Sequence, residues 1–227
     1  MHCYTDLMAR TLAVLVVLGL GSITVGAQAR PSAEELARSL QQRYDKVRDF
    51  SADFVHMYKG GVLRKQVTER GTVVVKKPGK MRWTYTAPEK KTFVSDGVKI
   101  YSYIPQDRQV IVSDVPTGND ATTAVMFLAG KGDITRDFTA SYAEGGPAGT
   151  WPLKLVPKKA ERDYDTLVLA LDPATLQIQA LTTTDRQGGE STFTFTNMKE
   201  NRGLSDKEFA FRIPRGVDVI TDGSVSR

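Results

Sequence analysis

The chain has 227 residues, of which 31 are Lys or Arg, 26 are Asp or Glu, two are His and one is Cys. Its net charge of +5 is spread over charges of both signs without a long basic run, which argues against a nucleic-acid-binding surface. Outside the first residues there is no cysteine and a single histidine, His56, which excludes disulfides and argues against a zinc or transition-metal site.

The first 29 residues are typical of a secretory signal peptide. Arg10 supplies a short positive region, residues 11–25 form an apolar run, and Ala27-Gln28-Ala29 offers small residues for cleavage after Ala29. A retained membrane anchor is the alternative, but the run is short and rich in small residues. No cysteine follows it, so we expect no N-terminal lipid. We therefore predict an exported chain, residues 30–227, that forms a single domain around one hydrophobic core.

A capped amphipathic helix opens this domain. Ser32 and Glu35 have the spacing of a capping box, in which hydroxyl and carboxylate satisfy each other's backbone amides. An apolar stripe follows at helical spacing: Leu36, Leu40, Tyr44 and Val47. We expect this stripe to pack on a sheet, with contact to a ligand as the alternative.

Residues 50–112 alternate apolar and polar side chains with a period of two, broken by Gly and Pro, as in consecutive antiparallel strands. On the first of them Phe54 shares a face with His56, which we interpret as a half-buried structural residue. After the Pro78-Gly79 turn, one face carries three large apolar groups, Met81, Trp83 and Tyr85. Such a face must be covered by something. Further extended segments are predicted at 153–157, 166–171, 176–185, 191–199, 209–211 and 217–219.

Between the two sets of strands the pattern predicts a short helix from Asp120 to Gly130. Val125 and Leu128 lie on one side of it, and Phe127 extends its apolar character to the other. A short helix that is apolar nearly all round is buried on more than one side. Two interpretations stay open: an ordinary core helix, or a lid whose inner side faces a cavity. A further turn capped by Asp133 should follow.

Chemical motifs are absent from the rest of the chain. It has no glycine-rich phosphate loop, no nucleophile elbow and no spaced histidine–carboxylate motif. Two carboxylates distant in sequence could still meet in the fold. The sequence nevertheless predicts a binding protein with no cofactor, and not an enzyme.

A series of segments, taken in order, resembles the periplasmic outer-membrane lipoprotein carrier family (LolA-type) over nearly the whole mature chain. The segments are Phe50-Ser51-Ala52-Asp53-Phe54, Lys77-Pro78-Gly79-Lys80-Met81-Arg82-Trp83, Val94-Ser95-Asp96-Gly97, Phe127-Leu128-Ala129-Gly130, Leu155-Val156-Pro157-Lys158 and Pro214-Arg215-Gly216-Val217. The resemblance implies an α+β, mostly β fold. We expect a half-open antiparallel β-barrel of about 10–11 strands, with an N-terminal helix and a short helical lid over the concave face.

The resemblance also implies a function. Such a protein holds the acyl chains of lipoproteins in its cavity, takes them from an inner-membrane lipoprotein-releasing transporter and delivers them to an outer-membrane acceptor. We expect a soluble periplasmic monomer that contacts these membrane complexes transiently and binds no nucleic acid. The residues expected to line the acyl-chain cavity are Phe54, Met81, Trp83, Tyr85, Val125, Phe127 and Leu128.

One departure from the family pattern concerns the lid. The family has a basic residue, usually Arg, before the proline after the early strand, and it hydrogen-bonds to the helical lid. The matching residue here is Lys77, a point charge without the planar fork of arginine. The latch should therefore be weaker, or be replaced by packing of Met126 and Phe127.

Other proteins share this scaffold, so alternative functions stay open: an envelope sensor or interaction protein, or a general lipid-binding protein. The sensors usually carry a second domain, for which this chain has no room. The membrane-anchored acceptor of the pathway needs a lipidated N-terminal cysteine that is missing here.

Overall fold

The structure is a computed structural model that describes residues 30–60, 66–115, 128–130, 132–161 and 164–221. The predicted signal peptide and most of the predicted lid, including Val125, Met126 and Phe127, lie outside these residues. All elements below belong to one compact unit, Pro31–Arg227. The helical elements are α1 (Ala33–Asp45), α3 (Ile134–Asp137) and the 3₁₀ helix η1 (Asp206–Phe209). The strands are β1 (Asp49–Lys59), β2 (Gln66–Lys76), β3 (Lys80–Ala87), β4 (Lys91–Asp96), β5 (Lys99–Ile104), β6 (Gln109–Asp114), β7 (Phe138–Tyr142), β8 (Trp151–Pro157), β9 (Thr166–Leu171), β10 (Ile178–Thr184), β11 (Glu190–Glu200) and β12 (Asp218–Thr221).

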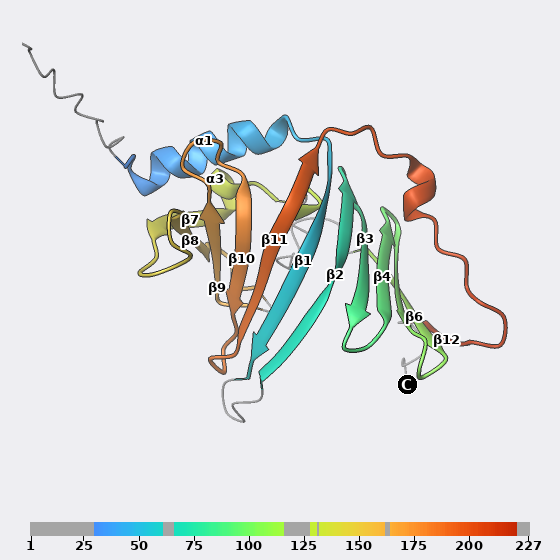
Figure 1. The fold of residues 1–227 in the computed structure, drawn as a ribbon. Coiled ribbons are helices and arrows are strands. Elements are labelled where there is room, and N and C mark those ends of the chain that lie inside the picture. Colours follow the sequence, from blue (N-terminus) through green and yellow to red (C-terminus); the bar gives the residue numbers. More distant parts are fainter. Residues whose placement is uncertain (1–29, 61–65, 116–127, 131, 162–163, 222–227) are drawn as a thin grey trace, which may run out of the picture. The chain divides into compact units, whose positions relative to one another are not determined.

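The strands of the described residues form one 12-stranded sheet in the order β12-β6-β5-β4-β3-β2-β1-β11-β10-β9-β8-β7 (Figure 1). The order does not close on itself, which confirms the predicted mostly-β, half-open architecture. Two details differ from the prediction. There are 12 strands where 10 or 11 were expected, and β12 pairs with β6 in parallel, whereas all other neighbours are antiparallel.

The N-terminal helix forms as its sequence predicts. Ser32 Oγ accepts a hydrogen bond from the backbone N–H of Glu35 at 3.2 Å, and Glu35 Oε2 accepts one from the backbone N–H of Ser32 at 2.9 Å. These two bonds satisfy amides that the first helical turn leaves free. The apolar stripe is buried, and α1 packs against α3, β7 and β8. The predicted packing role of the stripe is thus confirmed.

One face of the sheet carries the core. We call it the inner face and define it by four buried side chains on β1 and β3: Phe54, Met81, Trp83 and Tyr85. Strand alternation places them together, because β1, β2 and β3 are consecutive neighbours in the sheet. Core residues of α1 belong to the same cluster.

The chain after β11 runs over the ends of β2 and β3 and then past β4 to β12 (Figure 1), and its bonds to Arg82, which alternation turns away from Met81 and Trp83, place it on the opposite, outer face of the sheet. We call residues 201–217 the strap. The N–H groups of its residues 202–204 donate to the buried carboxylate of Asp49 at 2.7, 3.0 and 3.4 Å. Arg82 then donates to the backbone oxygens of Glu208 and Ala210 at 2.6 and 2.8 Å. The strand predicted at 209–211 is wrong, because Phe209 ends η1 and is buried against the sheet.

Candidate functional site

Aromatic rings gather at the centre of the inner face. We call six of them the ring cluster: Phe54, Trp83, Tyr85, Phe93, Phe193 and Phe195. The Phe54 ring centroid lies 5.1 Å from that of Trp83 and 4.9 Å from that of Tyr85, both edge to face. The ring centroids of Trp83 and Phe193 are also 5.1 Å apart. Aromatic pairs at such separations stabilise a fold beyond the area that they bury.

The rings meet because the strand register aligns them, and because one neighbouring position has no side chain. Phe54 of β1 lies opposite Gly71 of β2. A Cβ at Gly71 would collide with the Phe54 ring, 2.9 Å away, and with the backbone oxygen of Thr84. The glycine therefore leaves the space that the Phe54 ring occupies.

Five of the seven residues predicted to line an acyl-chain cavity lie within the described chain, and all five are buried in one core. Their exposed fractions are 2% for Phe54, 7% for Met81, 2% for Trp83, 7% for Tyr85 and 2% for Leu128. The other two, Val125 and Phe127, lie outside the described residues. Contact of these side chains with acyl chains stays a prediction.

A polar network borders the ring cluster on the same face of the sheet. His56 stacks on the Phe193 ring, with centroids 4.1 Å apart, and its Nδ1 lies 2.9 Å from Glu69 Oε2. An Nδ1–H that donates to Glu69 leaves Nε2 to accept from the Ser191 hydroxyl at 2.8 Å. The Lys91 ammonium donates to the other Glu69 oxygen and lies 4.4 Å from the Tyr85 ring centroid. The prediction that His56 is a half-buried structural residue is consistent with this placement.

The charges of the network depend on burial and pairing. Burial lowers the pKa of His56, although its bond to Glu69 opposes this shift. Burial raises the pKa of Glu69, but the hydrogen bonds from Lys91 and His56 outweigh burial and hold that pKa below its usual value. At neutral pH the network is therefore a neutral imidazole beside a Lys91–Glu69 ion pair. Sequence reasoning missed Glu69, Lys91 and Ser191, which come from three different strands.

A second set of contacts joins the end of α1, the turn between β2 and β3, and residues 128–130. The Tyr44 hydroxyl donates to the backbone oxygen of Leu128 at 2.6 Å in a buried position. The Gly79 N–H donates to the backbone oxygen of Ala129 at 2.8 Å. We call Tyr44, Lys77, Gly79 and residues 128–130 the latch.

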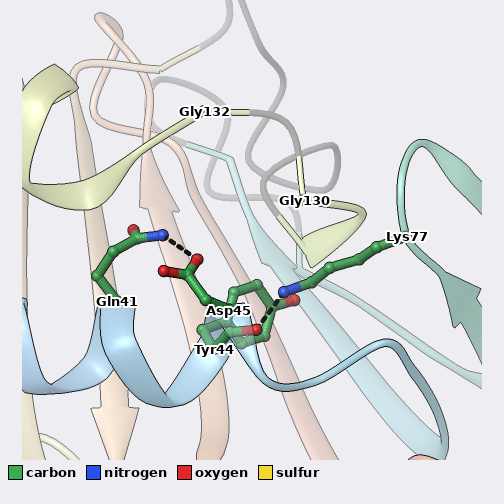
Figure 2. Close-up of a pocket in the computed structure, with 6 residues that line it drawn as sticks. All are labelled: Gln41, Tyr44, Asp45, Lys77, Gly130 and Gly132. Atoms are coloured by element: carbon green, nitrogen blue, oxygen red, sulfur yellow. Dashed lines mark hydrogen bonds between the residues drawn. The ribbon is translucent and has the colours of Figure 1, made fainter.

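Lys77 connects the β2–β3 turn to α1 (Figure 2). Its ammonium donates to the backbone oxygen of Tyr44 and lies 3.2 Å from the centroid of the Tyr44 ring. A cation in this place also complements the C-terminal end of the helix dipole. Burial lowers the pKa of Lys77 to about 8, against the opposing attraction of Asp45 and Glu200.

Gly130 closes the latch against the side chain of Lys77. Its φ of +78° is in the left-handed region, and a Cβ there would lie 2.8 Å from Lys77 Cδ. Beside these groups is a cavity of about 110 Å³, whose lining residues are drawn in Figure 2: Gln41, Tyr44, Asp45, Lys77, Gly130 and Gly132. This is well below the roughly 300 Å³ at which small-molecule sites begin, so the cavity belongs to the latch and is no site for a lipid.

The structure thus places Lys77 beside the last residues of the predicted lid, 128–130, but with its hydrogen bond directed to α1. The bonds to residues 128–130 come from Tyr44 and Gly79, which the sequence singled out only as a packing residue and a turn residue. Helical spacing predicted the burial of Tyr44 but not the partner of its hydroxyl, which is 84 positions away.

Comparisons with known proteins agree with this architecture. The family model for the outer membrane lipoprotein carrier protein LolA matches residues 45–212. An outer-membrane lipoprotein carrier protein from Chromohalobacter salexigens is 30% identical over 204 residues, which cover 89% of this chain and 93% of that protein. One from Pseudomonas paraeruginosa is 28% identical over 213 residues, covering 94% and 100%. Among solved structures, an uncharacterized conserved protein from Thermus thermophilus superposes with a TM-score of 0.51 at 13% identity, over 82% of this chain and 98% of that one, which indicates a shared fold.

Proposed function

The chain belongs to the outer-membrane lipoprotein carrier family, LolA, and from this premise we propose that the inner face receives the acyl chains of a lipoprotein. The cargo is the lipoprotein, and its binding free energy comes from the burial of its acyl chains. Each buried methylene contributes about 0.8 kcal/mol, so two or three chains gain on the order of 30–40 kcal/mol before the costs of binding are subtracted. The supporting observation is the ring cluster, a broad uncharged wall on one face of an open sheet.

The second part of the proposal is that the latch controls access to this wall. Phe54 and Trp83 are each 2% exposed, so cargo reaches them only when the groups that cover them move aside. The bonds from Tyr44 and Gly79 hold residues 128–129, at the C-terminal end of the predicted lid. Breaking these two bonds frees that end of the segment. Lys77 acts indirectly, by holding Tyr44 in position.

The remaining parts of the proposal concern location and partners. Residues 1–29 are a signal peptide, and the mature chain works in the periplasm as a monomer. An inner-membrane lipoprotein-releasing transporter loads it, and an outer-membrane acceptor unloads it. Within the described residues, none of the helices combines the length and the apolar character needed to cross a membrane.

Uptake and its place can be measured in one experiment. The mature chain is produced with photo-methionine, incubated with a diacylated lipopeptide or with the same peptide without acyl chains, and analysed by native mass spectrometry. We expect a one-to-one complex with the acylated peptide only. After illumination, the acyl chains should cross-link to Met81 on the inner face and not to Met57, which alternation places on the outer face. No uptake of the acylated peptide, or cross-links at Met57 alone, would refute the proposal.

We further propose that the carrier catalyses no reaction. The order Ser191–His56–Glu69 has the hydrogen-bond sequence of a hydrolase triad, so this part has its own test. Glu69, however, is shared with Lys91 in a network whose members satisfy one another. Hydrolysis of a chromogenic acyl ester should be no faster with the wild type than with Ser191→Ala. A rate that falls to background in Ser191→Ala would contradict a pure carrier.

A further inference from the structure

Trp83 carries a polar atom that the fold leaves without a partner. Its side chain is 2% exposed, and Nε1 is buried without any hydrogen-bond acceptor in the described part of the chain. An indole N–H can only donate. In buried tryptophans this N–H usually has a hydrogen-bond partner, because a buried donor without one has lost its hydrogen bonds to water and gained no other in exchange.

The neighbouring polar groups show the opposite behaviour. Both ring nitrogens of His56 and both carboxylate oxygens of Glu69 have hydrogen-bond partners. The inner face therefore accepts polar groups where each is paired, and the donor of Trp83 is an exception to that local rule. Packing alone does not explain the exception, since a phenylalanine ring would supply apolar contact without the unpaired N–H.

The position of the donor restricts what could pair with it. Trp83 lies between Met81 and Tyr85 on β3, with the Phe54 and Phe193 rings each 5.1 Å from its own. A group that arrives among these rings must travel with hydrocarbon. A carboxylate or phosphate would lose its hydration there, and the cation described beside the ring cluster, Lys91, is already paired with Glu69. A neutral carbonyl oxygen is a good acceptor at a much smaller desolvation cost.

We propose that the Trp83 Nε1–H donates a hydrogen bond to the carbonyl oxygen of an ester- or amide-linked acyl chain. The inference rests on the proposed function and adds a chemical selectivity to it. The inner face distinguishes acyl chains, which bring a carbonyl, from alkyl chains of equal length, which do not. In the cargo-free protein the Trp83 N–H has no hydrogen-bond partner among the described residues. The bound cargo supplies one.

The test compares two cargoes and two proteins. One cargo is a diacylated, ester-linked lipopeptide, and the other is its dialkyl, ether-linked analogue with chains of the same length. They are titrated against the wild type and Trp83→Phe, which keeps an aromatic ring and removes the N–H. We expect the wild type to bind the ester three- to tenfold more tightly than the ether. Trp83→Phe should lose that factor for the ester and nothing for the ether.

A second measurement needs no variant and so does not depend on the folding of Trp83→Phe. The chain has two tryptophans, Trp83 and Trp151. In the wild type labelled with ¹⁵N-tryptophan, the indole proton of Trp83 should move downfield with the ester cargo and less with the ether. Trp151 serves as the internal reference.

The outcomes separate this inference from the carrier function. Equal affinities for ester and ether, or an equal loss for both in Trp83→Phe, would overturn the hydrogen bond and leave the carrier intact. Equal affinities are also what we expect if the Trp83 N–H donates to the face of a neighbouring ring and not to a carbonyl oxygen. Failure of the wild type to bind either cargo would refute the carrier function itself, and this inference with it.

Discussion

Removal of the Tyr44 hydroxyl is the most direct test of the latch. Tyr44→Phe deletes the donor that lies 2.6 Å from the backbone oxygen of Leu128, and it keeps the ring under the Lys77 ammonium. A buried neutral hydrogen bond contributes about 1 kcal/mol net. The closed arrangement should therefore lose about 1 kcal/mol relative to the open one, which makes the open population roughly fivefold larger.

Tyr44→Phe should change two measurable quantities in opposite directions: the affinity for cargo should rise and the thermal stability should fall. Cargo reaches the inner face only when the covering groups move, so its apparent affinity is reduced by the small fraction of open protein. Tyr44→Phe should bind the diacylated lipopeptide about fivefold more tightly. Its thermal midpoint should fall by about 2–4 °C, because the lost bond also stabilises the fold.

Tyr142→Phe is the matched control. The Tyr142 hydroxyl donates to the backbone oxygen of Pro31 at 2.8 Å, away from the latch. We expect this variant to lose a similar amount of thermal stability with no change in affinity. Equal affinities of the two variants, or weaker binding by Tyr44→Phe, would refute the role of the latch in loading.

Three further predictions follow from the same contacts. Burial lowers the pKa of Lys77 from 10.5 to about 8, so the unfolded chain binds its proton more tightly and the fold gains stability as the pH rises between these values. The free energy of unfolding of the wild type, minus that of Lys77→Met, should rise over this window, and Lys77→Arg, which stays charged, should show no such rise. Gly71→Ala should destabilise the fold by about 1–3 kcal/mol in urea denaturation, because its Cβ collides with the Phe54 ring, and an unchanged midpoint would contradict that packing. Asp49→Asn should speed amide hydrogen exchange at residues 202–204, whose N–H groups all bond to its carboxylate, and unchanged exchange would show that the strap is held elsewhere.

Local patterns predicted the parts of the fold that local chemistry decides. The capping box at Ser32 and the alternation of Met81, Trp83 and Tyr85 need only neighbours in sequence, and both formed as predicted. The strand predicted at 209–211 was wrong, because Phe209 ends a 3₁₀ helix with its side chain buried, and an alternation over only three residues does not distinguish that arrangement from a strand.

The candidate site depends on contacts that no local pattern encodes. His56, Glu69 and Lys91 meet only because β1 to β4 adopt one particular register, and a shift by one residue would turn each to the other face. The hydroxyl of Tyr44 finds a backbone oxygen, an acceptor that every residue offers, so the identity of Leu128 gave no hint of the bond. The resemblance singled out the basic residue in the turn before β3, Lys77. It did not indicate that this residue would bond to the C-terminal end of α1.

The latch and the Trp83 donor can be separated by how each treats two cargoes. The latch acts before cargo binds, so Tyr44→Phe should tighten ester- and ether-linked lipopeptides by the same factor and leave their ratio unchanged. The donor acts only on a carbonyl, so Trp83→Phe should change the ratio and leave the ether alone. Because the two substitutions act on different steps, their changes in binding free energy should add in the double variant. A ratio that changes in Tyr44→Phe would mean that the latch touches the cargo, and the division into an opening step and a binding step would then fail.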